Sequence, residues 1–377
     1  MSVIVAVDTH PVSYPEPNDH DRHRSVCLVR ITDSDGRVGW GECTTYWPEA
    51  SLAAAVIVDA ARDEIVGKDP LQNGSILRSL GDRCWWYGTA GAGIAGFALS
   101  GIDVALWDLK GHVLGASVLD LLGGPAKDTL PAIASSHATS PVIGEMAEEI
   151  AGWLASGLTG VKVGFGKLGN ANLGFEHDRD VTFMRTVREA IGPHARIMID
   201  CGVRNHWSVP DAVRRVRAFE EHGLHWIEEP LGADDPDGYL QLKRATSTLI
   251  AYGEREFSPA GVERLLRAAS GDVVGLDPGR VGGITGFAGA CDIIELARRQ
   301  GNAHAWSTAV DTAASLAISW AKPVCKQFEE QPFKGPMQAD LIGGAIAHEN
   351  GLMPRPTGPG LGIEVDQTIV DRYLIGR

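Results

Sequence analysis

The chain has 377 residues, with 46 Gly, 20 Pro and 44% hydrophobic residues, which excludes collagen-like, fibrous and disordered proteins. No apolar run reaches the ~18 residues that cross a bilayer. The net charge is −14 without a basic block, so nucleic acid and anionic membranes, which need a contiguous positive patch, are excluded as partners. The six cysteines are scattered and form no CxxC pair, which predicts free thiols. The first residues do not resemble a secretory signal, so we expect a cytoplasmic protein.

An α+β pattern occupies residues 1–127. Ser25–Ile31 and Arg37–Cys43 are typical of strands, and the turn sequence DSDG between them predicts a hairpin. Residues 51–66 and 92–115 are predicted helices, and the second is expected to be well buried because it has broad apolar faces. Gly123-Gly124-Pro125 then breaks the chain.

Short apolar runs alternate with helical segments from residue 130 onward. The predicted strands are Leu130–Ser135, Gly160–Phe165, Arg196–Asp200, Leu224–Glu228, Thr248–Glu254, Asp272–Asp277, Asn302–Trp306 and Val324–Glu329. Ser208 and Ser258 precede Pro210 and Pro259 as helix starts. Eight strands with seven intervening helices predict a parallel barrel. A doubly wound open sheet is the alternative, although neither a GxGxxG nor a Walker loop is present. The tail from about residue 350 is predicted to form turns and a short strand that pack back on the N-terminal domain.

Ionisable residues stand at the ends of successive predicted strands. They are Lys162, Asp200, Glu228, Glu254, Asp277, His304 and Glu329, and from Asp200 onward the spacing is 23 to 28 residues, about one strand–helix unit. Because the carboxyl ends of barrel strands meet at one mouth, we expect these side chains to lie together there.

Three of these residues, Asp200, Glu228 and Glu254, are carboxylates on adjacent strands. Such a group cannot stay ionised in a partly dry pocket without a cation, and hard oxygen ligands favour Mg²⁺ over Zn²⁺. The alternative is that they are solvated loop carboxylates paired with Arg204 and Arg255.

The remaining residues are candidate proton-transfer groups. A metal and burial would lower the pKa of Lys162 so that it acts as a base near neutral pH, and Asp277 would orient His304. A protonated Glu329 could donate a hydrogen bond to an oxyanion. The structural alternatives are a surface lysine, a buried core histidine and an exposed Glu329–Glu330 pair.

Sequence segments in this order resemble the enolase superfamily, specifically the mandelate racemase/muconate lactonizing enzyme family and its mandelate racemase subgroup. They are VGWGE (38–42), SGIDVALWDLKG (100–111), VKVGFG (161–166), MID (198–200), WIEEP (226–230), GE (253–254), LDPGRVGGITG (276–286), HAW with Thr308, and GPGLGIEVD (358–366). The resemblance implies a (β/α)7β modified TIM barrel over residues 128–349, with an α+β capping domain formed by 1–127 and 350–377.

The same resemblance implies residue roles. Asp200, Glu228 and Glu254 would hold Mg²⁺, Lys162 and the His304–Asp277 pair would act as acid/base groups on opposite faces of the substrate, and Glu329 would be the electrophilic acid. Two segments depart from the family: Gly160 replaces the first lysine of Lys-x-Lys, and VRNHW (203–207) follows Asp200-Cys201-Gly202. Candidate substrate-binding residues are His20, His23, Tyr46 and Trp47 in the lid, with Arg22, and Arg204, Asn205 and His206 after the third barrel strand; these last three can equally be surface residues.

The implied chemistry is removal of the proton α to a carboxylate, with the enediolate stabilised by a divalent cation. We expect dehydration of a sugar acid, an aldonate or aldarate, to its 2-keto-3-deoxy acid. A racemase/epimerase or a sugar-lactone cycloisomerase is the alternative on the same scaffold, and a non-catalytic binding protein is the alternative class. The resemblance also implies a homo-oligomer.

Overall fold

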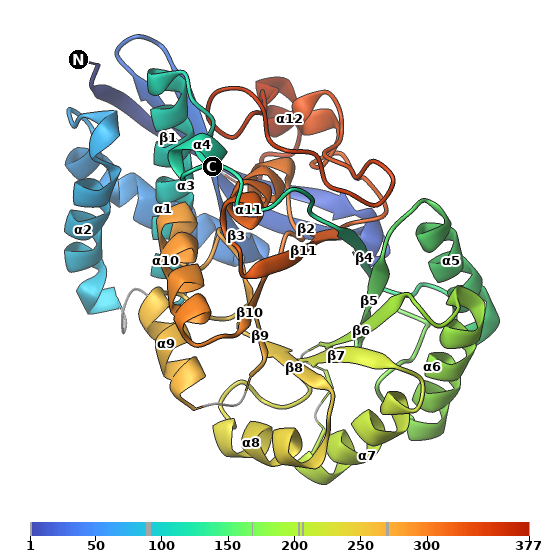
Figure 1. Cartoon of the computed structure of the whole chain (residues 1–377). Helices are drawn as coiled ribbons and strands as arrows, with labels where there is room; N and C mark the ends of the chain where they lie inside the picture. The colour runs from blue at the N-terminus through green and yellow to red at the C-terminus, as the bar shows by residue number, and fades with distance from the viewer. Residues whose placement is uncertain are drawn as a thin grey trace.

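The computed structural model describes residues 2–87, 92–167, 169–202, 204–205, 207–268 and 271–376. Within these ranges eight parallel strands close a barrel in the order β10-β11-β4-β5-β6-β7-β8-β9 (Figure 1). The strands are β4 (Ala132–Ser136), β5 (Gly160–Phe165), β6 (Arg196–Cys201), β7 (Leu224–Glu228), β8 (Leu249–Tyr252), β9 (Val273–Leu276), β10 (Gln300–Ala303) and β11 (Cys325–Glu330). All eight predicted strands are confirmed, with ends that differ by at most three residues. The closed order excludes the open doubly wound sheet.

Helices alternate with these strands and cover the outside of the barrel (Figure 1). They are α5 (Ile143–Ala155), α6 (His177–Ile191), α7 (Val209–Glu220), α8 (Pro236–Ala245), α9 (Pro259–Arg267), α10 (Gly283–Leu296) and α11 (Ala309–Ala321). The predicted starts of α7 and α9 are confirmed, because Ser208 Oγ accepts from the Asp211 amide and Ser258 Oγ accepts from the Gly261 amide. The (β/α)7β barrel expected from the sequence is therefore present.

The barrel interior is filled by side chains from several strands. Ile133, Met198, Trp226, Ala251 and Val273 form one buried cluster, and Trp226 is completely buried within it. This packing makes the inside of the barrel a solid core, so that chemistry is confined to the rim.

The N-terminal part forms a cap of three antiparallel strands and several helices. The strands are β1 (Ile4–Glu16), β2 (Arg22–Asp33) and β3 (Val38–Tyr46), and the helices are α1 (Pro48–Ile65), α2 (Asn73–Cys84), α3 (Ile94–Leu114) and the short α4 (Val118–Leu121). The predicted hairpin and both predicted helices are confirmed. Strand β1 and helix α2 were not predicted from the sequence. Pro11 and Pro15 interrupt the strand pattern of β1, which is paired only with β2 in the described sheet.

Strand β3 packs directly on helix α3. A Cβ atom at Gly41 would lie 2.0 Å from the Gly101 carbonyl oxygen and 2.6 Å from the Ala105 amide nitrogen, so glycine is required by the close approach of the two backbones. This contact fixes the sheet whose far end, at Tyr46, reaches the barrel mouth.

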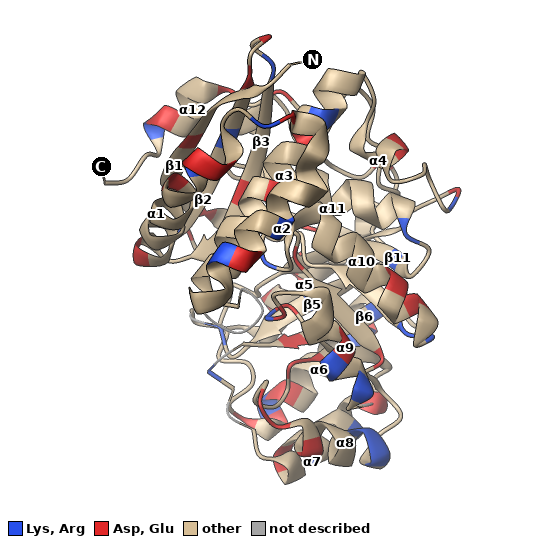
Figure 2. Cartoon of the chain, turned by 90° about the vertical axis from the view of Figure 1, so that its left-hand side faces the viewer, with Lys and Arg blue, Asp and Glu red and all other residues tan. Residues whose placement is uncertain are grey.

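The C-terminal tail contacts the cap. The Ser13 amide donates to the Tyr373 carbonyl oxygen at 2.9 Å, and the Ile375 amide donates to the Pro11 carbonyl oxygen at 2.9 Å. The tail contains the short helix α12 (Gln367–Arg372), which lies beside β1 (Figure 2). The short strand predicted in the tail is wrong: in the described tail, residues 350–376, only isolated bridges form, because a run with five glycines and three prolines cannot sustain a ladder.

Basic and acidic residues are interspersed along the helices and strands drawn in Figure 2. Within the described ranges, no helix combines the length and the apolarity that crossing a bilayer requires. All six cysteines are buried and free.

Candidate active site

The ionisable residues predicted at the strand ends do come from successive strands. Lys162, Asp200, Glu228 and Glu329 lie in β5, β6, β7 and β11, while Glu254, Asp277 and His304 follow β8, β9 and β10. Asp200 and Glu228 are direct neighbours in the pairing of β6 with β7. Parallel strands bring all seven to the C-terminal rim of the barrel.

Glu254 reaches this rim by a turn that requires glycine. Gly253 has φ +127°, and a Cβ there would lie 2.9 Å from the Gly275 carbonyl oxygen. The chain can therefore leave β8 sharply and place Glu254 near His304, with 3.4 Å between His304 Nε2 and Glu254 Oε2.

Lys162 is at the centre of a buried ion-pair network. Its Nζ lies 2.8 Å from Glu228 Oε2 and 2.8 Å from Glu329 Oε1, and the three side chains are at most 4% exposed. Burial alone would lower the pKa of Lys162, but the carboxylates of Glu228 and Glu329 outweigh burial and hold the pKa well above its usual value. The two carboxylates stabilise the ammonium form of Lys162. The lowered pKa predicted from the sequence depends on a bound cation beside the lysine and stays a prediction.

Glu329 accepts hydrogen bonds through both carboxylate oxygens. Ser135 Oγ donates to Oε2 at 3.0 Å, and Asn302 Nδ2 donates to Oε1 at 2.6 Å. Its Oε1 atom also lies 2.8 Å from Lys162 Nζ, so both carboxylate oxygens are engaged by donors of this chain. The role of Glu329 as an electrophilic acid stays a prediction. Glu329 here holds Lys162 in place.

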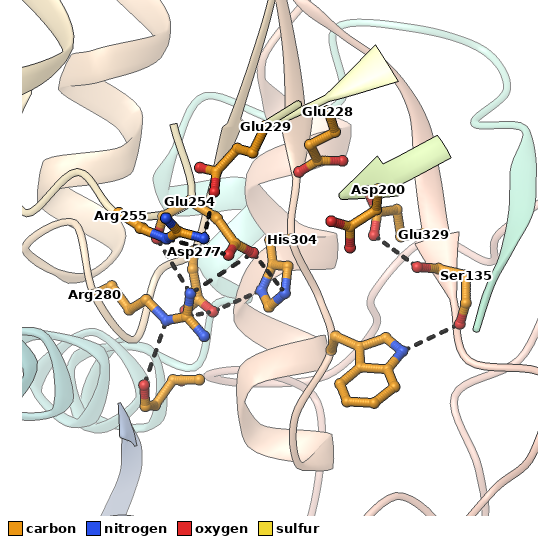
Figure 3. A network of polar contacts seen from close by, with 12 residues as sticks. Ser135, Asp200, Glu228, Glu229, Glu254, Arg255, Asp277, Arg280, His304 and Glu329 are labelled. Carbon is orange, nitrogen blue, oxygen red and sulfur yellow. Dashed lines mark hydrogen bonds and ion pairs between the residues drawn. The ribbon is translucent and has the colours of Figure 1, made fainter. Parts of the chain in front are cut away.

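His304 is held by Asp277, as predicted. His304 Nδ1 donates to Asp277 Oδ2 at 2.9 Å, which directs Nε2 toward Glu254. Figure 3 shows Glu254, Asp277 and Arg280 gathered on one side of the imidazole. Burial would raise the pKa of Asp277, but Arg280 and His304 hold it below its usual value. Asp277 is therefore an ionised partner that fixes the tautomer and the orientation of His304.

Each of the three predicted metal ligands contacts a basic side chain. Glu228 contacts Lys162, Glu254 contacts His304, and Asp200 Oδ2 lies 3.5 Å from Lys167 Nζ. In the part of the chain that the structure describes, no group of three or more His, Cys, Asp or Glu residues is arranged to hold a metal ion.

The chemistry of the donor set nevertheless fits a hard divalent cation. Burial, together with the charges of Asp200 and Glu254, raises the pKa of Glu228 well above its usual value, so these carboxylates repel one another across the rim. Oxygen donors on three adjacent strands are the ligands that Mg²⁺ prefers. The three carboxylates fit Mg²⁺ by donor type and by strand order. In this structure each of them contacts a basic side chain of the protein.

A cavity of about 290 Å³ opens between the cap and the barrel at this rim. Seven Lys or Arg side chains line it, against three Asp or Glu: the cations are Arg22, Arg24, Lys162, Lys167, Arg204, Arg255 and Arg280, and the acids are Asp19, Asp200 and Glu254. A cavity with this excess of positive charge, in a chain of net charge −14, favours an anionic ligand.

The predicted substrate-binding residues divide into two groups. Tyr46, Trp47 and Arg204 line the cavity. His20 and Asn205 are not among the lining residues, and Asn205 instead packs against Gly166 and Gly174. His206 lies outside the described residues.

The prediction for His23 is wrong. His23 is exposed, does not line the cavity, and its Nδ1 lies 3.3 Å from Ser13 Oγ. Side chains alternate along β2, so Arg22 and Arg24 face the cavity while His23 faces away from it.

Several cavity residues were missed in the sequence analysis. They are Arg24, Ser135, His137, Lys167, Arg280 and Trp306. The period-two alternation of β2 could have identified Arg24, since it shares a face with Arg22. Lys167 lies in the loop after β5 and had no sequence signal of its own.

The cap is bonded to the loop that follows His304. Glu42 of β3 is buried and accepts hydrogen bonds from Ser307 and Thr308, and burial raises its pKa. Trp306 stands between His304 and Ser307 in the sequence. It donates its indole N–H to the Ser135 carbonyl oxygen at 3.1 Å. The position of His304 is therefore set from both the barrel and the cap.

A parallel (β/α)7β barrel under an α+β cap, with this rim, defines the architecture of the enolase superfamily. Residues 145–369 match the family model described as Enolase C-terminal domain-like. Residues 3–123 match the model of the Mandelate racemase / muconate lactonizing enzyme N-terminal domain. The chain belongs to the mandelate racemase/muconate lactonizing enzyme family of the enolase superfamily, as the resemblance predicted.

Similar proteins include dehydratases and cycloisomerases. A D-galactarolactone cycloisomerase of Agrobacterium fabrum is 32% identical over 93% of this chain and 91% of that protein. A D-gluconate dehydratase of Thermoproteus tenax is 29% identical over 96% of this chain and 72% of that protein. The crystal structure of a 3,6-anhydro-D-galactonate cycloisomerase from Zobellia galactanivorans superposes with a TM-score of 0.88 at 26% identity, covering 99% of this chain and 100% of that one.

Proposed function

We propose that this protein is a Mg²⁺-dependent enzyme that removes the proton α to the carboxylate of a sugar acid and expels the β-hydroxyl group, giving a 2-keto-3-deoxy acid. The observation that carries the proposal is that Lys162 and His304, the latter bonded to Asp277, line one cation-rich cavity. Relatives named as D-gluconate dehydratase and D-galactonate dehydratase support this reaction type.

Proton transfer falls to two groups that approach from different parts of the barrel. Lys162 comes from β5 and His304 follows β10, and β11 and β4 lie between these strands in the barrel order. One group takes the α proton, and the other donates a proton to the departing hydroxide, which leaves as water while the C–O bond breaks. The resulting enol then takes a proton at C3 and loses the proton of its C2 hydroxyl group, which gives the 2-keto acid.

Mg²⁺, held by Asp200, Glu228 and Glu254, would supply the positive charge that stabilises the enediolate. Among the chain's own groups, Asp277 keeps Nδ1 of His304 protonated, so that Nε2 is the atom that exchanges the proton. Lys162, held by Glu228 and Glu329, is the other proton-transfer group.

Ring opening is a second candidate function. It uses the same α-proton abstraction, but a ring oxygen leaves instead of a β-hydroxyl group. Relatives named as D-galactarolactone cycloisomerase and 3,6-anhydro-alpha-L-galactonate cycloisomerase favour it.

The test is incubation with Mg²⁺ and a panel of aldonates, aldarates and their lactones, with detection of 2-keto acid as its semicarbazone. We expect product that EDTA abolishes and Mg²⁺ restores. Product from lactones alone would support ring opening, whereas deuterium exchange at C2 without keto product would support racemisation.

Matched variants test the assigned residues. Lys162→Ala and His304→Ala should each lower kcat at least ~10²-fold, since each removes a proton-transfer group. Lys326→Ala and His194→Ala replace exposed residues of the same types and should leave kcat unchanged. Near-normal turnover in either of the first two variants would refute its role.

A further inference from the structure

One cation of the cavity, Arg24, has no use in the chemistry proposed above. It lies in β2 of the cap, is 3% exposed, and lines the cavity. Its guanidinium group lies over two rings, 4.9 Å from the centroid of Tyr46 and 5.1 Å from that of Trp306. Stacking of this kind holds the planar group in one orientation.

The guanidinium is short of hydrogen-bond acceptors. Its Nε and Nη2 atoms are buried and have no hydrogen-bond partner among the described residues. A buried charged donor without an acceptor is costly, so such an arrangement is expected where a ligand completes it.

Two buried carboxylates that act on Arg24 electrostatically are committed to other groups. Glu16 accepts from the side chains of Asn18 and Gln338, and Glu42 accepts from Ser307 and Thr308. Glu16 and Glu42 act on Arg24 only through longer-range attraction. Burial alone would lower the pKa of Arg24, but this attraction and that of the neighbouring tyrosines outweigh burial and raise the pKa.

Arg22, two residues earlier on the same face, provides the contrast. Its Nη1 lies 3.4 Å from Asp19 Oδ1, so its charge has a carboxylate partner. Asp19 is also the acceptor for the Tyr46 hydroxyl group at 2.9 Å. The unmatched positive charge on the cap side of the cavity is therefore that of Arg24.

The two walls of the cavity thus carry different groups. The barrel wall carries Lys162 and His304. In the proposed function, the reacting carboxylate end of the substrate lies against this wall. The cap wall carries Arg24, a planar donor fork suited to a carboxylate.

We propose that Arg24 binds a second carboxylate, at the end of the substrate remote from the reacting carbon, and so makes the enzyme selective for dicarboxylic sugar acids over monocarboxylic ones. This inference rests on the proposed function for the position of the first carboxylate. The physical basis of selectivity is that a monocarboxylic acid leaves the desolvated guanidinium unpaired.

The test compares the binding of galactarate, which has two carboxylates, with that of galactonate, which has one. Calorimetric titrations with Mg²⁺ are made in the His304→Ala background to limit turnover, with and without Arg24→Met. We expect galactarate to bind at least ~10-fold more tightly than galactonate, and Arg24→Met to weaken galactarate binding roughly 10- to 100-fold while changing galactonate binding less than about threefold.

Controls separate binding from folding. Arg30→Met removes an arginine of the same strand that pairs with Asp8 at 3.7 Å and does not line the cavity, and it should leave both affinities unchanged. If Arg24→Met does not fold, Arg24→Lys keeps the charge but loses the planar fork, and galactarate should still lose at least ~5-fold relative to galactonate.

Four outcomes would overturn the inference: equal affinities for the two acids when Arg24 is present, no binding of either acid, equal losses for both acids in the Arg24 variant, or tighter binding of 6-phosphogluconate than of galactarate. Equal losses would show that Arg24 only neutralises the buried cap carboxylates, and tight 6-phosphogluconate binding would show a phosphate site. Arg24-dependent galactarate binding without turnover of any sugar acid would sustain this inference and refute the proposed function. Turnover of sugar acids, combined with an unchanged preference for galactarate in Arg24→Met, would sustain the proposed function and refute this inference.

Discussion

Replacing Lys162 by Met would remove the ammonium group that Glu228 and Glu329 both contact at 2.8 Å. Methionine is similar in length and apolar, so packing is largely kept and the lost charge dominates. Because all three side chains are at most 4% exposed, the two carboxylates would be left buried without their partner. Breaking a buried pair in this way costs about 3 to 5 kcal/mol of unfolding free energy.

The assay is urea unfolding in EDTA at pH 7.5, followed by circular dichroism. The control, Arg267→Met, breaks an exposed pair with Glu263, whose side chains are 77% and 48% exposed, and should cost less than about 1 kcal/mol. Adding Glu329→Gln to Lys162→Met removes one of the stranded charges and should restore part of the loss.

Acidification gives a second readout. Burial and its acidic neighbours raise the pKa of Glu228, so it takes up a proton earlier than an ordinary glutamate as the pH falls. A protonated Glu228 carries no negative charge for Lys162 to compensate. The loss of unfolding free energy in Lys162→Met should therefore become smaller between pH 7.5 and pH 5. A deficit below about 1 kcal/mol at pH 7.5, or one that grows on acidification, would refute the reasoning.

Two further predictions concern the cap. Gly41→Ala should lower the unfolding free energy by about 1 to 3 kcal/mol or more, because its Cβ would meet the Gly101 carbonyl oxygen at 2.0 Å; wild-type stability in thermal or urea unfolding would count against the packing described. The hydrogen bond to Asp108 raises the pKa of His112, so its stabilisation is fully present below the unfolded-state pKa and is lost as the pH rises through the folded-state value. The stability difference between wild type and His112→Gln should therefore be larger at pH 5.5 than at pH 8, and an equal or opposite difference would show that this pair is not formed.

The barrel was predictable because its signals are local and periodic. Each strand from β5 to β10 is a short segment followed by a helix, so both the parallel topology and the rim positions follow from chain order. The pairing of His304 with Asp277 was predictable for the same reason, since residues at the ends of adjacent strands meet.

What the sequence could not supply was the direction of individual side chains. The contact of Lys162 with two carboxylates depends on packing across several strands. His23 and Arg24 are consecutive in sequence, but they fall on opposite faces of β2, and only the paired sheet shows which face meets the barrel. Lys167 reaches Asp200 from an irregular loop that no periodicity describes.

The bonds between β1 and the tail have a consequence for how the protein is made. Ser13 bonds to Tyr373, a residue synthesised 360 positions later, which corresponds to roughly 20 to 70 s at ribosomal elongation rates. Throughout that time the nascent cap has an incomplete edge, so the first part of the chain to emerge is among the last to be finished. Chaperones that shield exposed strands would have their longest opportunity to act there, and a permuted gene that encodes the tail before β1 would shorten the delay.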